Sequence, residues 1–369
     1  MKPLFAAAAW LLLAVAPSLA SISVTAKATG SSSPITIYGA ASSSYAITGW
    51  DIYVDSNLVF RQNTSASSIT EAVSMSTGTH KVVVKAWNTS GANGSASLAV
   101  TVGSSTAAVP VVNHVFIVVE ENHSYGSVIG SSSMPYLNSL AQNYGLATSY
   151  YANTHPSIGN YFMLTAGQII TNNDSYTATV TADNIVRHLL TAGKTWKSYA
   201  ESLPYAGYTG GDTGSYVERH NPLSYFSDVR NSSVEKMNLV PFTQFAHDLS
   251  NNALPRYSFI VPNVNDDAHN GTLAQADYWL KQNIGPLIAS STFQNGGLLV
   301  IVFDESFDSD TAYGGGHVAM VVVSPKAKRG YRCGTLFQHQ STLRLMEQAL
   351  GVYSYPGAAG SASNMTCFF

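Results

Sequence analysis

Apolar and polar residues follow two different patterns along the chain, and the change falls between residues 103 and 113. Before it, short stretches alternate apolar and polar positions, for example at residues 50–54 and 80–87. After it, continuous apolar runs alternate with longer segments in which apolar residues recur every three or four positions. The first pattern is typical of strands that bury one face, and the second of buried strands that alternate with amphipathic helices. We therefore expect two domains with different folds.

The first domain, residues 21–103, is expected to be all-β. Clusters of Ser, Gly and Asn separate its short strands and predict turns. Several short strands at this spacing favour a small sandwich of the immunoglobulin type, without the cysteine pair of antibody domains. The Ser- and Ala-rich stretch that follows predicts a linker over residues 104–112.

The second domain, residues 113–369, is expected to be an α/β domain with a mostly parallel central sheet. Its strands are predicted from continuous apolar runs at residues 114–120, 257–261, 298–303 and 318–323. Its helices are predicted at residues 134–144, 184–190, 234–249 and 273–288. Runs as apolar as these suit strands that are buried on both faces, and the alternation of strand and helix implies a parallel sheet.

Polar residues follow three of these strands, in a chain that has few charges. Charged residues make up 11% of the sequence, against about 25% in a typical globular domain. Yet acids and amides follow the predicted strands at residues 120–123, 263–269 and 304–305. In open α/β sheets, ligands bind beyond the carboxyl ends of the strands. These oxygen donors predict a divalent cation: Mg²⁺, Ca²⁺ or Mn²⁺ for oxygen alone, and Zn²⁺ or iron if histidines take part.

Residues 156–167 predict a helix with a serine in its first turn. Pro156 suits the start of a helix and Gly167 its end, which places Ser157 in the first turn. The unpaired N–H groups and the helix dipole there favour an anion and help a hydroxyl to ionise. On local sequence alone, a serine in this place is more often a helix cap than a nucleophile.

Several short motifs occur in the order found in a known enzyme family. They are Glu121-Asn122-His123-Ser124-Tyr125, His155-Pro156-Ser157 with Asn160-Tyr161, Arg219-His220-Asn221-Pro222, Val261-Pro262-Asn263 with Asp266 and His269, Phe303-Asp304-Glu305, and Gly316-His317-Val318. This series resembles the phosphoesterase family of bacterial acid phosphatases and phospholipases C, which belongs to the alkaline phosphatase superfamily. The resemblance implies a three-layer, alkaline-phosphatase-like domain that hydrolyses phosphate esters.

The resemblance also implies a reaction centre. Glu121, Asn122, Asp304 and Glu305 would hold one divalent metal ion of uncertain identity. Ser157 would attack phosphorus and form a phosphoserine that water then hydrolyses.

Further residues would contact the substrate. Imidazoles of His220 and His269 would bind phosphate or protonate the leaving group. The set expected to bind phosphate is Asn122, Asn160, His220, His269 and His317. A second metal site formed by Asp266, His269 and His317 is left open.

The amino terminus predicts export. Residues 1–20 have a positive start, an apolar run and a small-residue cleavage site, as in a signal peptide. The apolar run is shorter than the ~20 residues that cross a membrane, so no transmembrane anchor is expected. The mature protein is expected to be secreted or periplasmic. Because that environment is oxidising, we expect Cys333 and Cys367 to form a disulfide.

Some classes of function are disfavoured, and others stay open. A net charge of -3 without a basic stripe disfavours nucleic acid as a partner. A serine esterase is one alternative, although the chain has no Gly-x-Ser-x-Gly motif. An extracellular binding or adhesion protein with an inactive scaffold is another. The expected substrate is a small-molecule or lipid phosphate ester, either monoester or diester, and the sandwich domain would bind a surface or another protein.

Overall fold

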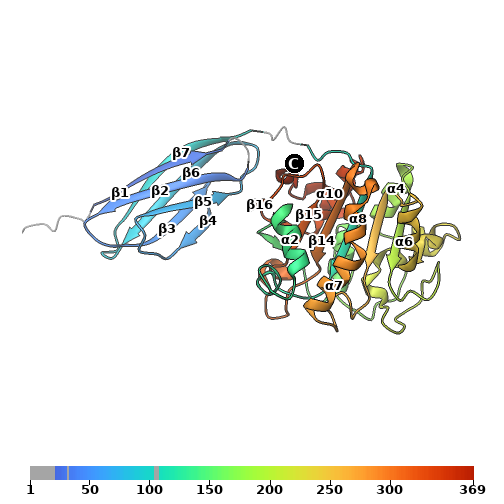
Figure 1. Cartoon of the computed structure of the whole chain (residues 1–369). Coiled ribbons are helices and arrows are strands. Elements are labelled where there is room, and N and C mark those ends of the chain that lie inside the picture. Colours follow the sequence, from blue (N-terminus) through green and yellow to red (C-terminus); the bar gives the residue numbers. More distant parts are fainter. Residues whose placement is uncertain (1–20, 31–32, 104–107) are drawn as a thin grey trace, which may run out of the picture. The chain divides into compact units, whose positions relative to one another are not determined.

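The computed structural model describes residues 21–30, 33–103 and 108–369 (Figure 1). They fall into two compact units, one on each side of residues 104–107. The predicted signal peptide and the first part of the predicted linker lie outside the described residues. Within the described residues, no helix is both long enough and apolar enough to cross a membrane.

The first unit is all-β, which confirms the prediction. Its strands form two antiparallel sheets, in the orders β1-β2-β5 and β4-β3-β6-β7. Apolar side chains at alternate positions, among them Ile35, Trp50 and Val84, are fully buried in its core. The strands are β1 (Ile22–Thr29), β2 (Ile35–Ser43), β3 (Ile47–Val54), β4 (Asn57–Gln62), β5 (Ser68–Val73), β6 (Gly78–Asn88) and β7 (Asn93–Val102).

The second unit is built on an eight-stranded sheet in the order β12-β11-β13-β8-β14-β15-β9-β16. The five strands from β12 to β14 are parallel to one another, and β15 is antiparallel to both of its neighbours. The strands are β8 (His114–Glu120), β9 (Gly145–Ala147), β11 (Trp196–Ala200), β12 (Leu239–Pro241), β13 (Tyr257–Val261), β14 (Gly297–Phe303), β15 (Met320–Val323) and β16 (Tyr331–Cys333). A separate pair joins β10 (Tyr150–Tyr151) to β17 (Phe337–Gln338).

Helices surround this sheet (Figure 1). Every residue of β14 and all but the first of β8 are buried, as expected of strands covered on both faces. Helix α3 packs against α10, and α2 packs against α7. The helices are α1 (Tyr125–Val128), α2 (Pro135–Asn143), α3 (Ser157–Ala166), α4 (Ile185–Thr191), α5 (Ser227–Arg230), α6 (Thr243–Ser250), α7 (Leu273–Asn283), α8 (Gly285–Ala289), α9 (Ser291–Gln294) and α10 (His339–Ala349), with short 3-10 helices including η1 (Glu218–His220) and η3 (Glu235–Asn238).

The α/β class and the mostly parallel sheet confirm the sequence prediction, but two predicted helices are wrong in detail. Residues 234–249 form η3, then β12, then α6, because Pro241 cannot donate a helical hydrogen bond and Leu239 and Val240 are buried at the sheet edge. Residues 273–288 are split between α7 and α8, since Pro286 stands in the first turn of a new helix.

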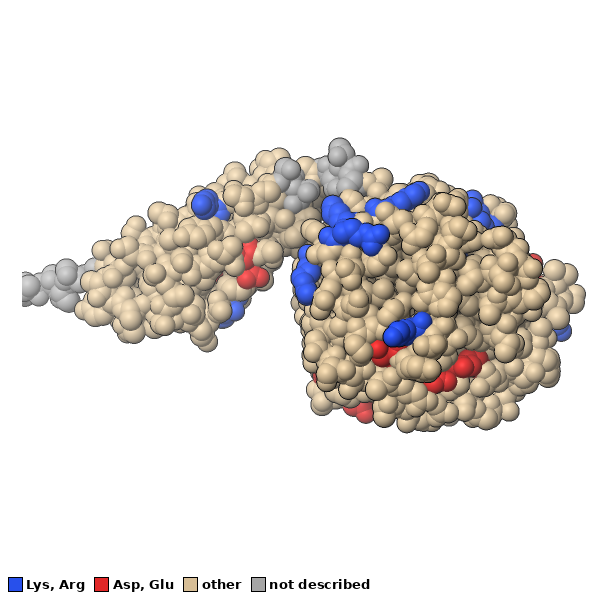
Figure 2. Space-filling view, viewed as in Figure 1, with Lys and Arg blue, Asp and Glu red and all other residues tan. Residues whose placement is uncertain are grey.

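The carboxyl terminus is tied to the sheet. Cys333 at the end of β16 forms a disulfide with Cys367 in the last turn of the chain. Charged side chains are sparse on the face of the molecule that Figure 2 shows, and most of that surface carries neither sign.

Candidate active site

The central strand of the sheet ends in the candidate site. β8 lies between β13 and β14, and the carboxyl ends of these three parallel strands meet at one edge. The N–H of Glu121, directly after β8, donates to the carbonyl of Asp267 at 2.8 Å. The N–H of Asp304, directly after β14, donates to the carbonyl of Glu120 at 3.0 Å. These backbone bonds fix the three segments relative to one another.

Ser157 is the first residue of α3 and points into this edge. The helix begins after Pro156 and ends at Gly167, whose φ of 67° is left-handed, as the sequence predicts. The side-chain oxygen of Ser157 lies 3.1 Å from Glu121 Oε2 and 3.1 Å from Glu305 Oε1. A hydroxyl has one hydrogen, so it cannot donate fully to both carboxylates. Ser157 is therefore held between two acidic groups rather than acting as a helix cap.

Three buried carboxyl groups converge around this hydroxyl. Glu121 and Asp304 are fully buried, and Glu305 is 3% exposed. Burial raises the pKa of Glu121 well above its ordinary value. Burial also raises the pKa of Asp304 to about 7, and burial together with the charge of Asp304 raises the pKa of Glu305 to about 9. So many negative charges cannot share a buried site unless they bind protons or a cation.

The donor set fits a divalent cation. Asp304 Oδ1 accepts the N–H of Asn122 at 3.1 Å, but its Oδ2 is buried without a hydrogen-bond partner among the described residues. Carboxylate oxygens of this kind are the donors that hard divalent cations prefer. Asn122 itself adopts a left-handed φ of 27°, a strained conformation of the kind that clusters at functional sites.

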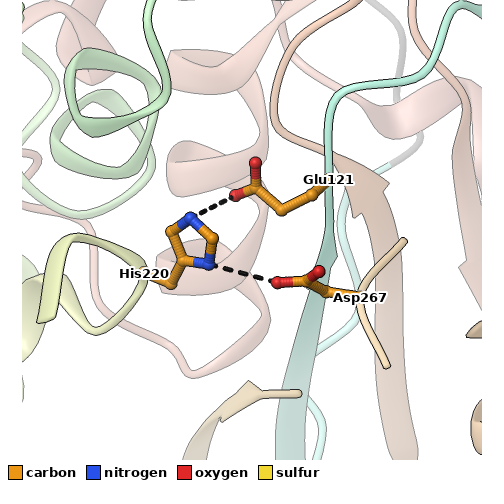
Figure 3. Close-up of side chains that lie close together, drawn as sticks. All are labelled: Glu121, His220 and Asp267. Carbon is orange, nitrogen blue, oxygen red and sulfur yellow. Dashed lines mark hydrogen bonds and ion pairs between the residues drawn. The ribbon is translucent and has the colours of Figure 1, made fainter. Parts of the chain in front are cut away.

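A histidine links Glu121 to a further acid (Figure 3). His220 is fully buried, with Nε2 3.1 Å from Glu121 Oε1 and Nδ1 3.1 Å from Asp267 Oδ2. Tyr161 donates its hydroxyl to the same Glu121 oxygen at 2.5 Å and stacks on the imidazole. Burial, followed by the positive charge of Arg219, holds the pKa of His220 well below its ordinary value. Nδ1 is hydrogen-bonded to Asp267, whereas Nε2 lies close to Glu121 but has no hydrogen-bond partner among the described residues. A neutral His220 has one N–H, so it packs between the two acids and can donate to only one of them.

This group differs from the second metal site considered from the sequence. The structure brings Asp267, not Asp266, to Glu121 and His220, and those three offer donor atoms within 4.8 Å of one another. The Asp266 carboxylate accepts from the side chains of Asn263 and Gln275 instead. Its predicted partners lie elsewhere, so the described residues do not form the expected three-residue cluster.

Those two predicted partners have separate surroundings. His269 is half-buried beside His220, with ring centroids 5.8 Å apart. The ring of His317 is stacked between those of Tyr125 and Tyr151, at centroid distances of 4.3 and 4.8 Å. His269 thus stays close to the reaction centre, whereas His317 belongs to an aromatic stack.

Asn160 holds the turn that precedes α3. Its side-chain oxygen accepts the backbone N–H groups of Asn153 and Thr154, and its amide donates to the carbonyl of Thr154. The side chain is fully buried. We therefore give Asn160 a role in shaping the approach to Ser157, rather than the phosphate contact expected from the sequence.

Two groups near the site received no role from the sequence. His155 places Nδ1 2.7 Å from Glu305 Oε2 and Nε2 3.0 Å from the carbonyl of Asp310. Asp174 accepts the N–H of Ile158, the residue after Ser157, at 3.2 Å. The sequence could have indicated a role for His155, because it lies in the same motif as Ser157. No sequence pattern indicates a role for Asp174.

Comparisons with known proteins identify the family of the chain. Residues 130–353 match the Phosphoesterase family. The chain is 35% identical over 261 residues to the phosphatidylinositol-3-phosphatase of Mycobacterium tuberculosis. The aligned region covers 68% of this chain and 81% of that protein. It is 32% identical over 241 residues to a probable acid phosphatase of Kluyveromyces lactis, covering 63% of this chain and 56% of the yeast protein.

Another fungal acid phosphatase and one solved structure are also similar to the chain. The acid phosphatase of Aspergillus fumigatus is 30% identical over 251 residues, which cover 66% of this chain and 56% of that protein. The chain thus spans little more than half the length of these two fungal relatives. The crystal structure of an alkaline phosphatase superfamily protein from Vibrio parahaemolyticus aligns with a TM-score of 0.46 at 14% identity, over 67% of this chain and 68% of that one. Since the family match covers more than half of the sequence, the chain belongs to the Phosphoesterase family and is a hydrolase of phosphate esters.

Proposed function

We propose that this protein is an exported, metal-dependent phosphoesterase that uses Ser157 as its nucleophile. The observation that carries the proposal is the position of the Ser157 hydroxyl between the carboxylates of Glu121 and Glu305. Both of its hydrogen-bond partners are carboxylates. The described residues therefore place no imidazole on Ser157 as a Ser-His-Asp relay requires, which disfavours a serine esterase.

The metal site that we propose consists of Glu121, Asn122, Asp304 and Glu305. A bound divalent cation would lower the pKa of the nearby hydroxyl and offset the charge of the phosphoryl oxygens. The buried Asp304 Oδ2, which has no hydrogen-bond partner in the described part of the chain, supports this assignment. The proposal requires one divalent cation, drawn from Mg²⁺, Ca²⁺, Mn²⁺, Zn²⁺ and iron.

In the first step, Ser157 Oγ forms a bond to phosphorus as the ester oxygen leaves, and the serine proton passes to a neighbouring carboxylate. The departing oxygen takes up a proton, for which His269 is the candidate donor because it is half-buried beside His220. Water then attacks the phosphoserine, which releases inorganic phosphate and restores the hydroxyl.

The neighbouring side chains position the acids. Tyr161 and His220 both contact Glu121 Oε1, and His155 contacts Glu305 Oε2. Each contact limits the orientations of a carboxylate before substrate binds. Such preorganisation is what phosphoryl transfer mostly requires of a protein.

The wider setting is also a proposal. Residues 21–103 and 113–369 would be separate domains joined by a linker at 104–112, with residues 1–20 removed on export to the periplasm or the medium. The name of the mycobacterial relative makes phosphorylated lipids one candidate class of substrate, beside small water-soluble phosphate esters. The sandwich domain would bind a surface or a protein partner.

Two measurements test the reaction centre. Removing metal with EDTA and dialysis should abolish hydrolysis of p-nitrophenyl phosphate, and adding back the ion found in the purified protein should restore it. Ser157→Ala should lower kcat by at least about 1,000-fold, as expected when a nucleophile is lost. Ser258→Ala is the matched control, because this buried serine in β13 has no hydrogen-bond partner among the described residues. Full activity after EDTA treatment, or in Ser157→Ala, would refute the mechanism.

A further inference from the structure

We propose that Arg219 binds unesterified oxygens of the reacting phosphoryl group and thereby makes the enzyme selective for phosphate monoesters. The inference rests on the proposed function, since it takes Ser157 as the point of attack. It assigns a new binding residue and a substrate class to that same site.

Two chains of contacts connect Arg219 to the surroundings of the nucleophile. On one, Arg219 Nε is 3.7 Å from Asp174 Oδ2, and the other oxygen of Asp174 accepts the N–H of Ile158, next to Ser157. On the other, Arg219 directly precedes His220, which contacts Glu121, the hydrogen-bond partner of Ser157. The arginine therefore stands at the edge of the reaction centre.

The guanidinium of Arg219 has poor partners for its degree of burial. Its side chain is 15% exposed, and its Nε is buried without a hydrogen-bond partner among the described residues. Its Nε is 3.7 Å from Asp174 Oδ2, beyond hydrogen-bond distance, and one terminal nitrogen donates a long 3.3 Å hydrogen bond to Asp212, whose carboxylate is 56% exposed. A guanidinium normally satisfies its donors in pairs with carboxylate or phosphate oxygens. Arg219 thus has donors available for another anion.

A nearby arginine shows what a structural role looks like. Arg230 has the same 15% exposure, yet its Nε donates to the carbonyl of Ser224 and one terminal nitrogen donates to that of Thr177. Its other terminal nitrogen pairs closely with Glu218. Every nitrogen of Arg230 has a partner, whereas the Nε of Arg219 has none among the described residues.

Arg256 and Arg344 also have a buried Nε without a partner among the described residues. They lie elsewhere in the fold. Arg256 precedes β13, at the opposite edge of the sheet, and donates to the carbonyl of Val112. Arg344 lies within α10 and donates to carbonyls near the end of the chain. An unpaired Nε alone is therefore no sign of a binding site, and Arg219 differs because Asp174 and His220 connect it to the surroundings of Ser157.

The substrate class follows from counting oxygens. A phosphate monoester has three unesterified oxygens, so one can face the carboxylate-lined cation site while two remain for the guanidinium fork. A diester has two such oxygens, which leaves one for Arg219 and prevents a bidentate contact. A monoester dianion is also attracted more strongly by the guanidinium than a diester monoanion, because the Coulomb energy grows with the charge of the ligand. Arg219 should therefore favour monoesters over diesters.

The test compares Arg219→Lys with the wild type on p-nitrophenyl phosphate and bis(p-nitrophenyl) phosphate, with inorganic phosphate as inhibitor. Lysine keeps the charge but loses the fork. We expect kcat/KM for the monoester to fall roughly 10- to 100-fold, the inhibition constant of phosphate to rise by a similar factor, and diester hydrolysis to change less than about 3-fold. Arg256→Lys is the matched control and should leave all three values unchanged.

A second variant protects the test against a folding defect. Asp212→Asn removes the charge that competes for Arg219 but keeps an oxygen for the N–H of Glu218, which it now accepts at 2.8 Å. Phosphate should then inhibit about 2- to 5-fold more strongly, the range expected for an exposed ion pair. An unchanged or weaker inhibition, or an equal loss for monoester and diester in Arg219→Lys, would overturn the proposal.

The outcomes also separate this proposal from the proposed function. Suppose that EDTA abolishes the activity of the wild type and that Ser157→Ala is inactive, while Arg219→Lys lowers kcat/KM equally for monoester and diester. In that case only the role of Arg219 is wrong. If the wild type keeps full activity in EDTA, the proposed function itself fails, whatever the Arg219 variants do.

Discussion

Tyr161 offers a sharp test of how the proposed metal ligands are held. Its hydroxyl donates to Glu121 Oε1 at 2.5 Å, and the side chain is 1% exposed. Tyr161→Phe removes this one bond and keeps the ring that stacks on His220. Glu121 then loses one of the contacts that fix its orientation, so its affinity for a cation should fall.

The size of the effect follows from the kind of bond. A hydrogen bond to a charged group contributes about 1.5–3 kcal/mol. Groups that orient a metal ligand typically contribute about 10- to 100-fold in metal affinity, which is the same range. We therefore expect the dissociation constant of the metal to rise roughly 10- to 100-fold, with activity restored by excess metal.

The assay is calorimetric titration of metal into metal-free protein, together with activity measured against metal concentration. Tyr257→Phe is the matched control, because that hydroxyl is also buried but has no partner among the described residues. Its loss should leave metal affinity unchanged and should not lower stability. Equal metal affinity in Tyr161→Phe and the wild type would refute the assignment of Glu121 as an oriented ligand.

Four further predictions concern stability. Burial raises the pKa of Glu347 to about 7, and the pairing of His188 with Glu347 raises the pKa of His188 to about 9. Both groups therefore hold their protons to higher pH in the folded protein than in the unfolded chain, and the unfolding free energy should fall as pH rises from about 5 to about 9. His188→Gln should cost about 1–3 kcal/mol at neutral pH, since it leaves a buried acid without its partner, and denaturant titrations that show no loss would contradict this. Asp277→Ala should cost about 1–3 kcal/mol by thermal unfolding, because the Asp277 carboxylate accepts two backbone N–H groups in the first turn of α2. Reducing the bond between Cys333 and Cys367, which are 34 residues apart, should cost about 4 kcal/mol by the chain-entropy argument, and an unchanged melting temperature after reduction would refute it.

The sequence predicted the centre of the sheet well. β8 and β13 have the predicted bounds, and β14 begins one position earlier than predicted, at Gly297. These strands are buried on both faces, so their apolar runs are continuous and bounded by polar residues. Because they are parallel neighbours, the acids that follow them had to meet, and the structure brings Glu121, Asp304 and Glu305 together around Ser157.

The rest of the site depends on contacts that no local pattern encodes. Asp266 and Asp267 are adjacent, and only the conformation of their loop, with Ala268 at a φ of 76°, decides which one reaches His220. Asp174 reaches the first turn of α3 from a loop without regular structure. Short edge elements such as β12 were missed for a similar reason, since a three-residue strand leaves too few positions for a period.

The most direct test of the account is whether phosphate is transferred to Ser157. The metal-loaded enzyme would be mixed with p-nitrophenyl phosphate, quenched in acid during turnover, digested and analysed by mass spectrometry. The account predicts one added phosphoryl group on the peptide that contains Ser157, and none when the metal has been removed. Turnover with no phosphoserine, or with the phosphoryl group on another residue, would contradict it.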